Sequence, residues 1–410
     1  MSKYVIIGNS AAAVGCIEGI RKIDKTGEIV VISKESQHTY ARPLISYLLE
    51  GKTDLERMKY RPDDFYEVNG VKTVFGKAAT KIDADKKCVT LADGTVVEYE
   101  KLLYAAGSNP FVPHMQGMEK IEKQFTFMSL DDALAIEKEL GKDKRVLIIG
   151  AGLIGMKCAE GICDRVKSIT IVDMADRVLP AVLDAGGSEV IQKQMESKGI
   201  KFFLNDSAEQ FEKNHAVLKS GNKVDFDICI FCVGVRPNTS MFAEAGGKVN
   251  RGIVTDDRQQ TGIKDIYAAG DCAESYDVTT GTQRMLALLP NAYMQGEVAG
   301  INMAGSEIKF SKAAPMNAGG FFGLHIITAG SYDGCEVDCS QGDNYKKLFV
   351  KDGVLKGYIM IGDIRRAGIY TSLIREQTPL SSVNFELIKE HPQLMAFSKA
   401  DRKAKLAAEV

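Results

Sequence analysis

The chain has 410 residues, which is more than one ordinary hydrophobic core holds, so its length predicts two or three domains. Apolar residues make up 45% and charged residues 26%, which is typical of globular proteins and excludes disordered and fibrous classes. The net charge of −2 lacks the basic excess that nucleic-acid binding requires. No apolar run approaches the roughly 20 residues of a membrane helix. Because we find no targeting segment either, we expect a cytoplasmic protein without a membrane span.

The chain opens with a β-branched run, a turn of small residues and a helix-like stretch. The run is Tyr4–Ile7, and a second run, Ile29–Ile32, follows the helix. This pattern predicts a βαβ unit, which closes right-handed onto a parallel sheet. The turn reads Gly8-x-Ser10-x-x-Ala13 and keeps only the first glycine of the dinucleotide-binding pattern, so its signal is weak when taken alone.

The same unit returns near residue 145 with a complete motif, Gly150-x-Gly152-x-x-Gly155, between a strand and a helix. The first glycine permits a tight turn, the second lets a pyrophosphate approach, and the third lets helix and strand pack closely. Asp173 supplies the carboxylate expected about 20 residues further on, which binds ribose hydroxyls and repels a 2′-phosphate. We therefore expect NADH to be preferred over NADPH, although Arg177 nearby favours the opposite.

Three further stretches read as antiparallel strands. Residues 77–97 and 207–224 form short meanders, and residues 344–360 alternate around a turn at Asp352-Gly353. Helices are expected from Ile369 and after Ser398.

The cysteines predict neither a disulfide framework nor a metal site. Their number, nine, is odd, and they are scattered along the chain. Cys229 and Cys232 lie in an apolar strand and are expected to be buried structural residues. Cys335 and Cys339 have no second pair to complete a metal site.

Five segments, in this order, resemble the flavin-dependent pyridine nucleotide–disulfide oxidoreductase superfamily. They are the turn after Gly8, the Ala105–Gly107 turn, the Gly150 motif, Val233–Asn238 and the YAAGDCAE segment at 267–274. The resemblance covers nearly the whole chain. It implies an α/β fold with two Rossmann-like domains, the NAD-binding domain being inserted in the FAD-binding domain, and a C-terminal α+β interface domain. The implied boundaries are 1–115 with 242–310 for FAD, 116–241 for NAD and 311–410 for the C-terminal domain.

The resemblance also implies the cofactors FAD and NAD and the residues that bind them. Glu35 would bind the adenosine ribose, Arg42 a phosphate, Pro43 would face the isoalloxazine ring, and Asp271 would hold the ribityl chain. The full FAD set is Gly8, Ser10, Ala12, Ala13, Glu35, Arg42, Pro43, Ala79, Ala105, Ala106, Gly107, Gly270, Asp271, and Leu289, Pro290 and Asn291 near the pyrimidine end of the flavin. The NAD set is Gly150, Gly152, Leu153, Ile154, Gly155, Asp173 and Gly234.

The segment His38–Tyr47 selects a branch of this family because it contains no cysteine. Disulfide-reducing branches carry their redox cysteine there, so thiol-dependent activities become less favoured. The Tyr40-x-Arg42-Pro43-Leu44-x-Ser46 pattern instead looks like NADH:rubredoxin oxidoreductases, ferredoxin-reductase-type flavoproteins and the flavin domain of nitrite reductases.

This branch implies an NADH-dependent flavoprotein oxidoreductase that passes electrons through FAD to a one-electron acceptor, such as rubredoxin, ferredoxin or an iron–sulfur partner subunit. Three alternatives stay open. The first alternative is the NADH-reactive FAD subunit of a larger oxidoreductase, such as phenylglyoxylate dehydrogenase. The second is an NADH oxidase, and the third is a non-catalytic nucleotide-responsive protein.

Lys157 is the candidate catalytic residue together with Pro43. Relatives of this branch often carry a lysine at the position of Tyr47 and a glutamate at that of Lys157. We hypothesise that Lys157 supplies the cation beside the flavin, the alternative being a solvated surface lysine. Arg365 and Arg366 are either a docking site for an acidic electron carrier or ordinary surface charges.

Overall fold

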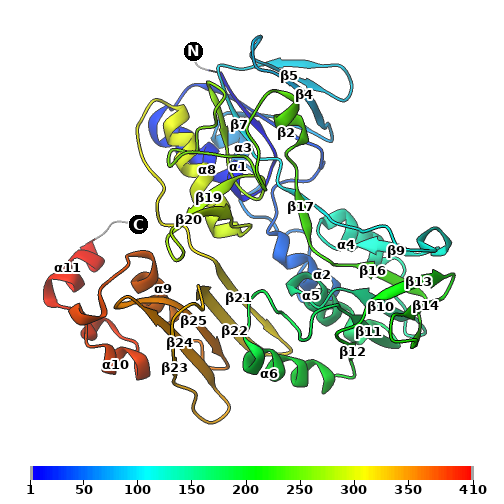
Figure 1. Cartoon of the computed structure of the whole chain (residues 1–410). Coiled ribbons are helices and arrows are strands. Elements are labelled where there is room, and N and C mark those ends of the chain that lie inside the picture. The colour runs from blue at the N-terminus through cyan, green and yellow to red at the C-terminus, as the bar shows by residue number, and fades with distance from the viewer. Residues whose placement is uncertain (1–2, 408–410) are drawn as a thin grey trace. The chain divides into compact units, whose positions relative to one another are not determined.

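The computed structural model describes residues 3–407, which form two compact units of mixed α/β structure (Figure 1). The first unit comprises the chain up to Ile32, Ala78–Ala106, and the chain from Thr239 onward. The second comprises Ser33–Lys77 and Gly107–Asn238. The predicted α/β class is confirmed. The predicted domain boundaries stay a prediction, because they are defined by cofactor binding whereas these units are defined by packing.

A parallel sheet forms the core of the first unit. Those strands of the sheet that belong to the first unit run in the order β18 (Ile266–Ala268), β7 (Lys101–Tyr104), β1 (Lys3–Ile7) and β2 (Glu28–Ser33). The residues Val5–Ile7 and Ile29–Ile32 are buried, as expected for strands that are covered on both faces.

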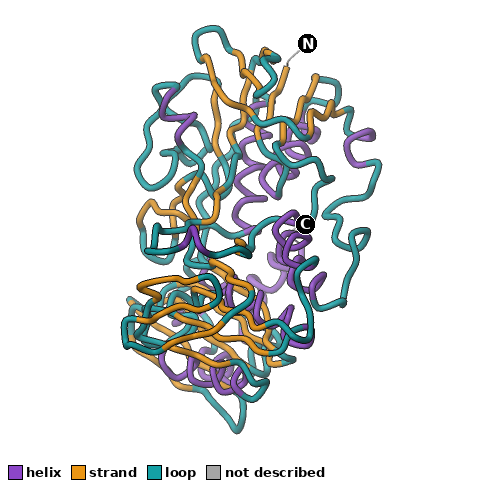
Figure 2. The backbone as a smooth tube through the Cα atoms, turned by 90° about the vertical axis from the view of Figure 1, so that its right-hand side faces the viewer, coloured by secondary structure: helices purple, strands orange, loops and turns teal. Residues whose placement is uncertain are grey.

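Two helices of the first unit, α1 (Ala11–Ile23) and α8 (Leu289–Met303), pack against each other at very short range. They lie side by side in Figure 1 and appear as purple coils among strands in the upper part of Figure 2. A β-carbon added to Gly296 would lie 1.9 Å from the Ala12 carbonyl oxygen, and one on Gly300 would lie 2.2 Å from that of Cys16. Glycine is therefore required along this contact.

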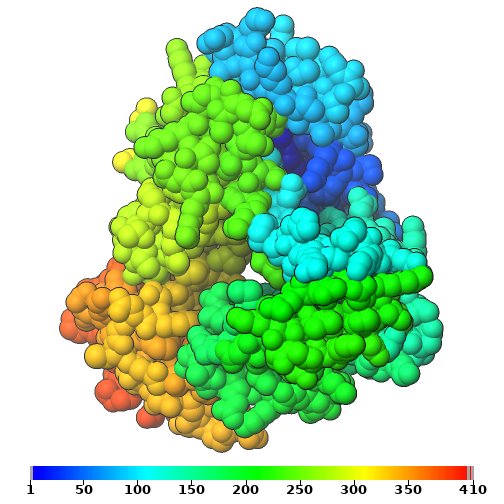
Figure 3. All heavy atoms as spheres, turned by 45° about the vertical axis from the view of Figure 1, so that its right-hand side comes forward, coloured from blue at the N-terminus to red at the C-terminus, as the bar shows by residue number. Residues whose placement is uncertain are grey.

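An antiparallel meander and a hairpin complete this part of the first unit. The meander consists of β4 (Ala79–Asp83), β5 (Cys88–Leu91) and β6 (Val96–Glu98), and it lies on the molecular surface (light blue in Figure 3). The hairpin pairs β19 (Glu274–Asp277) with β20 (Thr282–Met285).

The C-terminal part of the first unit is an antiparallel sheet with helices. The sheet order is β21 (Met316–Phe321), β22 (Leu324–Gly330), β25 (Val354–Ile361), β24 (Tyr345–Lys351) and β23 (Cys335–Asp338). The helices are α9 (Ala367–Arg375), α10 (Phe385–Glu390) and α11 (Lys399–Ala407). The predicted strands in 344–360 and both predicted helices are confirmed.

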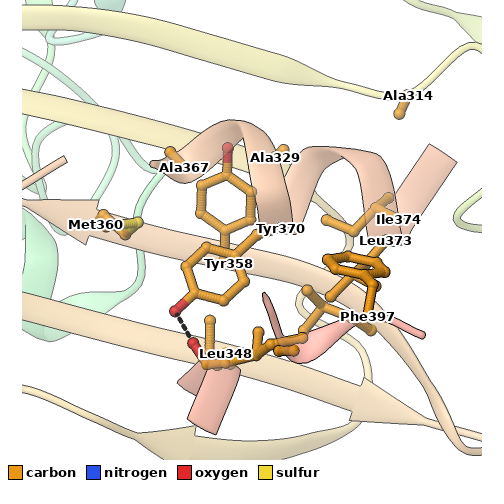
Figure 4. Packing of buried hydrophobic residues seen from close by; sticks show 13 residues of the cluster. Ala314, Ala329, Leu348, Tyr358, Met360, Ala367, Tyr370, Leu373, Ile374 and Phe397 are labelled. Atoms are coloured by element: carbon orange, nitrogen blue, oxygen red, sulfur yellow. Dashed lines mark hydrogen bonds between the residues drawn. The ribbon is translucent and has the colours of Figure 1, made fainter. Parts of the chain in front are cut away.

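A buried cluster that includes Tyr358, Tyr370 and Ala314 holds this sheet to its helices (Figure 4). The Tyr370 hydroxyl donates to the Ile388 carbonyl at 2.7 Å, which satisfies its polar end.

The second unit is built on a second parallel sheet. Its order is β12 (Lys201–Phe203), β11 (Ser168–Val172), β10 (Arg145–Ile149), β16 (Ile228–Phe231) and β9 (Gln124–Thr126). The expected second meander is present as β13 (Ala208–Glu212), β14 (His215–Leu218) and β15 (Lys223–Asp225).

The remaining helices and strands are short or connect these layers. In the second unit they are α2 (Ile45–Leu49), α3 (Phe65–Val68), β3 (Val71–Phe75), β8 (Ser108–Pro110), α4 (Leu130–Glu137), α5 (Leu153–Ile162), α6 (Ala185–Glu196) and β17 (Val235–Pro237). The first unit adds α7 (Ser240–Glu244). Among residues 3–407, no helix has the length and apolarity to cross a bilayer.

Candidate functional site

The two predicted nucleotide-binding turns repeat the same backbone construction. Gly8 donates its N–H to the Ile32 carbonyl and Gly150 donates to the Val172 carbonyl, each at 2.8 Å. Both glycines have positive φ, +113° and +116°. A β-carbon on Gly8 would lie 2.1 Å from the Ala105 carbonyl oxygen. The internal repeat inferred from the sequence is therefore present at the level of single hydrogen bonds.

The three glycines of the second turn have different surroundings. A β-carbon on Gly150 would lie 2.3 Å from the Cys232 carbonyl oxygen, and one on Gly155 would lie 2.1 Å from that of Gly150. A β-carbon on Gly152, which is the N-cap of helix α5, would meet no atom within 4 Å. The turn thus leaves an open approach to the backbone at the position where the sequence predicts the pyrophosphate.

Asp173 is bound to this same turn. Its Oδ2 accepts from the Ala151 N–H at 2.6 Å, and its Oδ1 accepts from the Ala175 N–H at 2.8 Å. The Ala151 carbonyl in turn accepts from the Leu179 N–H at 2.9 Å. Each carboxylate oxygen keeps a further lone pair for a ribose hydroxyl. Arg177 pairs with Asp176 at 2.8 Å.

The helix N-termini at the predicted sites suit anionic ligands. Helices α1, α5 and α8 carry no acidic residue in their first turns. A helix N-terminus presents unpaired N–H groups and a partial positive charge, which favours phosphates and other anionic groups.

Two predicted FAD residues of the first unit, Ala12 and Gly270, lie close together. A β-carbon on Gly270 would lie 3.3 Å from the Ala12 methyl carbon and 3.6 Å from that of Ala292. The Gly270 N–H donates to the Gln295 side-chain oxygen at 2.7 Å. Small residues from α1, from the end of β18 and from α8 therefore meet at one place.

Asn291 on α8 contains a buried acceptor without a partner. The residue is 1% exposed, and its Nδ2 donates to the Ala314 carbonyl at 3.1 Å. Its Oδ1 has no hydrogen-bond partner. Since native proteins rarely leave such an atom unpaired, a ligand with a donor group fits this position.

In the second unit, Glu35 and Arg42 form an ion pair with each other at 2.6 Å. The hydroxyl of Tyr40 connects them: it donates to Glu35 at 2.8 Å and accepts from Arg42 at 3.1 Å. It also accepts the Leu130 N–H at 2.9 Å, at the start of α4. Burial raises the pKa of Tyr40 far above its usual value. This role of Tyr40 was not predicted, although the Tyr-x-Arg spacing of Tyr40 and Arg42 is a local signal for it.

Lys157 is neither freely solvated nor an isolated cation. Its Nζ forms an ion pair with Glu160, which is 6% exposed, and lies 4.6 Å from the centre of the Tyr47 ring. These contacts disfavour a freely solvated lysine, and the role of Lys157 beside the flavin stays a prediction. Glu160 was not predicted as a partner of Lys157, although residues three apart on a helix are neighbours.

The other predicted site residues lie at the ends of elements. Pro43 lies in the short 3₁₀ turn Arg42–Leu44, and Ala13 is buried on α1. Gly234 has φ +106° and its carbonyl accepts from the Phe111 N–H at 2.9 Å. The rest begin or follow strands and helices: Ser10 is the N-cap of α1, Ala79 begins β4, Ala105, Ala106 and Gly107 follow β7, Asp271 follows β18, Leu289 and Pro290 begin α8, and Leu153 and Ile154 begin α5. Their roles in binding stay predictions.

Two sequence hypotheses concern residues outside these turns. Cys229 and Cys232 are free and buried, as predicted, and burial raises the pKa of Cys232 to about 12. Arg365 pairs with Asp363 at 2.7 Å, and Arg366 forms the N-cap of α9 with φ +61°.

Residues 2–296 match the pyridine nucleotide-disulphide oxidoreductase family. The chain belongs to this family. As a pyridine nucleotide-disulphide oxidoreductase, it is a flavoprotein oxidoreductase with FAD and NAD as cofactors, as predicted. Residues 315–378 match the rubredoxin NAD⁺ reductase C-terminal domain.

Individual members of the family resemble the chain over most of its length. It is 33% identical over 401 residues to the NADH-dependent phenylglyoxylate dehydrogenase subunit epsilon of Aromatoleum evansii, covering 94% of each chain. It is 30% identical to the NADH-rubredoxin oxidoreductase of Clostridium acetobutylicum, covering 88% of this chain and 92% of the relative. The solved structure of that enzyme covers 92% of this chain and 95% of its own, with a TM-score of 0.73. The putidaredoxin reductase in a covalent complex with putidaredoxin covers 100% of this chain and 99% of its own, with a TM-score of 0.88 at 22% identity, and supports the fold.

Proposed function

We propose that the protein oxidises NADH and passes the electrons through FAD to a small one-electron carrier of the rubredoxin or ferredoxin kind. The observation that carries this proposal is the match of residues 315–378 to the rubredoxin NAD⁺ reductase C-terminal domain. The cysteine-free segment His38–Tyr47 supports it, because no thiol is present there to pass electrons to a disulfide.

The residues of this chain would bind and orient the cofactors. FAD, when bound, accepts a hydride from NADH and gives up its electrons one at a time. Helix α5 and the open turn at Gly152 would hold the NADH pyrophosphate, and Asp173 the adenosine ribose. One NADH reduces two one-electron acceptors and releases one proton. No side chain of this protein has to remove a proton from NADH in this scheme.

We propose that Lys157 supports hydride acceptance by placing a positive charge near the flavin. Its pairing with Glu160 fixes the ammonium group and partly neutralises it. The ring of Tyr47 beside the ammonium group limits its movement.

Anaerobic stopped-flow spectroscopy tests the proposed function. We expect rapid bleaching of the flavin by NADH, slower bleaching by NADPH, and rapid reoxidation when an oxidised rubredoxin or ferredoxin is mixed in. Fast turnover with oxygen and none with the carriers would instead support an NADH oxidase. A flavin that NADH does not bleach would exclude both activities.

The second candidate is the NADH-reactive FAD subunit of a larger oxidoreductase. The likeness to the phenylglyoxylate dehydrogenase subunit epsilon over 94% of both chains favours it. Purification of the tagged protein from its native cells decides between the two candidates. Stoichiometric iron–sulfur subunits would support the second, and a monodisperse single chain that is fully active with a carrier would support the first.

A further inference from the structure

The buried amide of Asn291 is oriented by the C-terminal part of the first unit. Its Nδ2 donates to the Ala314 carbonyl at 3.1 Å. A carbonyl oxygen only accepts hydrogen bonds, so the amide nitrogen must face Ala314 and the amide cannot be flipped. Ala314 belongs to the buried cluster that holds the C-terminal sheet to its helices (Figure 4). The cluster therefore fixes the direction of the opposite atom, Oδ1.

That opposite atom is an unused acceptor. Asn291 is 1% exposed, and its Oδ1 has no hydrogen-bond partner. It lies in the first turn of α8, a helix of 15 residues whose first turn has no acidic side chain. Pro290 has no N–H group, but the other free N–H groups of such a turn attract carbonyl oxygens and anions. The start of α8 therefore combines donors with one desolvated acceptor.

The pyrimidine edge of oxidised flavin has the complementary pattern. It carries one N–H group, at N3, between two carbonyl groups. We infer that the Oδ1 of Asn291 accepts the hydrogen bond of flavin N3–H, and that Ala314 is the anchor that aims it. Asn291 would then recognise the flavin ring itself, and the C-terminal domain would contribute to that recognition through a single hydrogen bond. This inference rests on the proposed function, since it requires FAD at this site.

FAD methylated at N3 is the direct probe, because it lacks the N–H group. We expect the wild-type apoprotein to bind FAD more tightly than N3-methyl-FAD by about 2- to 12-fold, the value of one hydrogen bond. Binding is measured by the quenching of flavin fluorescence. The variant Asn291→Leu has a similar volume and no acceptor, so it should bind the two flavins with equal affinity. Asn291→Asp keeps an acceptor and should keep the preference, while its negative charge lowers the flavin midpoint potential.

Asn302 provides the matched control on the same helix. Its amide is also buried, but it is fully paired: Nδ2 donates to the carbonyls of Arg258 and Ile308 at 3.0 and 2.9 Å, and Oδ1 accepts from Ile308 at 2.8 Å. The variant Asn302→Leu should lower thermal stability and leave the ratio of the two flavin affinities unchanged.

Each outcome decides the inference. The same ratio in the wild-type protein and in Asn291→Leu would overturn it, with a buried water as the partner of Oδ1. If Asn291→Leu does not fold, equal binding of both flavins to the wild-type protein overturns it. In either case, the proposed function stands if NADH still bleaches the flavin of the holoprotein. An apoprotein that binds neither flavin would contradict both the inference about Asn291 and the proposed function.

Discussion

Substitutions at Gly152 and Gly155 are expected to affect two different properties, the affinity for NADH and the stability of the fold. A β-carbon on Gly152 meets nothing within 4 Å, whereas one on Gly155 meets the Gly150 carbonyl oxygen at 2.1 Å. We expect Gly152→Ala to fold normally and to weaken NADH binding about tenfold, equal to 1.4 kcal/mol, since its methyl group occupies the approach of the pyrophosphate. Gly155→Ala should instead lower the unfolding temperature. Titration with NADH and thermal unfolding measure the two effects, and a Gly152→Ala variant with normal affinity would contradict the assignment of this turn to NADH.

Two variants of the Lys157–Glu160 pair are expected to shift the flavin midpoint potential in opposite directions. If Lys157 stabilises reduced flavin, Lys157→Met should lower the flavin midpoint potential and Glu160→Gln should raise it, because the second change removes the neutralising carboxylate. For a two-electron couple, about 30 mV corresponds to 1.4 kcal/mol. Redox titration of the holoprotein measures both shifts. Lys193, which pairs with Glu189 on α6, is the control, and Lys193→Met should cause no shift. Equal potentials in all four proteins would contradict a role for Lys157.

Some residues of the site could be predicted one by one and others could not. Gly150, Gly155 and Asp173 follow a local pattern whose spacing alone assigns each backbone position. The orphan oxygen of Asn291 could not be predicted, because its environment depends on Ala314, which follows a long intervening helix and loop. Likewise, the hydrogen bond that the Leu130 N–H donates to the Tyr40 hydroxyl joins residues 90 positions apart.

At the scale of elements, the contact between α1 and α8 is the most demanding in the first unit. A β-carbon on Gly296 would lie 1.9 Å from a backbone oxygen of α1, which no side-chain adjustment relieves. We expect Gly296→Val to destabilise the protein by about 2–3 kcal/mol or more and to lower its FAD content. Chemical unfolding and the absorbance ratio of flavin to protein check this. Gly262→Val is the control, because a β-carbon there meets nothing within 4 Å, and an equally stable Gly296→Val variant would contradict the packing.

The sheet of the second unit has an acid-sensitive pair where β10 begins. Arg145 binds Asp227, which directly precedes β16, with side-chain contacts of 3.1 Å. The hydrogen bond from Arg145 lowers the pKa of Asp227. A carboxyl group whose pKa is lowered by folding stabilises the folded state at pH values above its unfolded pKa of about 3.9. This stabilisation is lost as the pH falls from there through the lower pKa of the folded state.

We therefore expect Asp227→Asn to cost about 1 kcal/mol at pH 7, since the pair is partly exposed and solvent screens it. The difference from wild type should shrink below about pH 4. Unfolding curves across this range measure the difference. Asp143→Asn removes the partner of Lys144, an exposed pair, and should have no measurable effect. A difference that grows on acidification would contradict the assignment.

The elements themselves were largely predictable because each depends on local pattern. The runs Val5–Ile7 and Val146–Ile149 are β-branched or aliphatic, and a glycine follows each, so strand and turn are specified together. The meanders carry turn residues between alternating stretches. The pairing of α1 with α8 was not predictable. Small residues on a helix indicate that another backbone packs closely against it, but they do not identify which element that backbone belongs to.

At the scale of the whole molecule, the segment Ser33–Lys77 is the main surprise. It follows the first nucleotide turn, and the family resemblance implies that it belongs to the FAD-binding domain. By packing, it belongs to the same compact unit as Gly107–Asn238. The contacts responsible are long-range: Tyr40 with Leu130, Gln37 with Asp131 at 2.8 Å, and Arg165 with the Leu49 carbonyl at 2.9 Å. Local sequence patterns do not encode such contacts, so the packing of this segment was not predictable, and the predicted boundaries of the FAD- and NAD-binding domains stay a prediction.

The two structural repeats make a prediction about which dinucleotide each turn binds. Their backbones are alike, so only the flanking residues distinguish them: an intact glycine motif at Gly150 and a Ser10-containing turn at Gly8. We expect FAD added to the apoprotein to slow hydrogen exchange at the start of α1 and of α8. NAD⁺ added to the holoprotein should slow it at the start of α5 and near Asp173. Hydrogen-exchange mass spectrometry resolves these segments, since they lie in different peptides. Protection of the α1 turn by NAD⁺ would mean that the assignment of the two repeats is reversed.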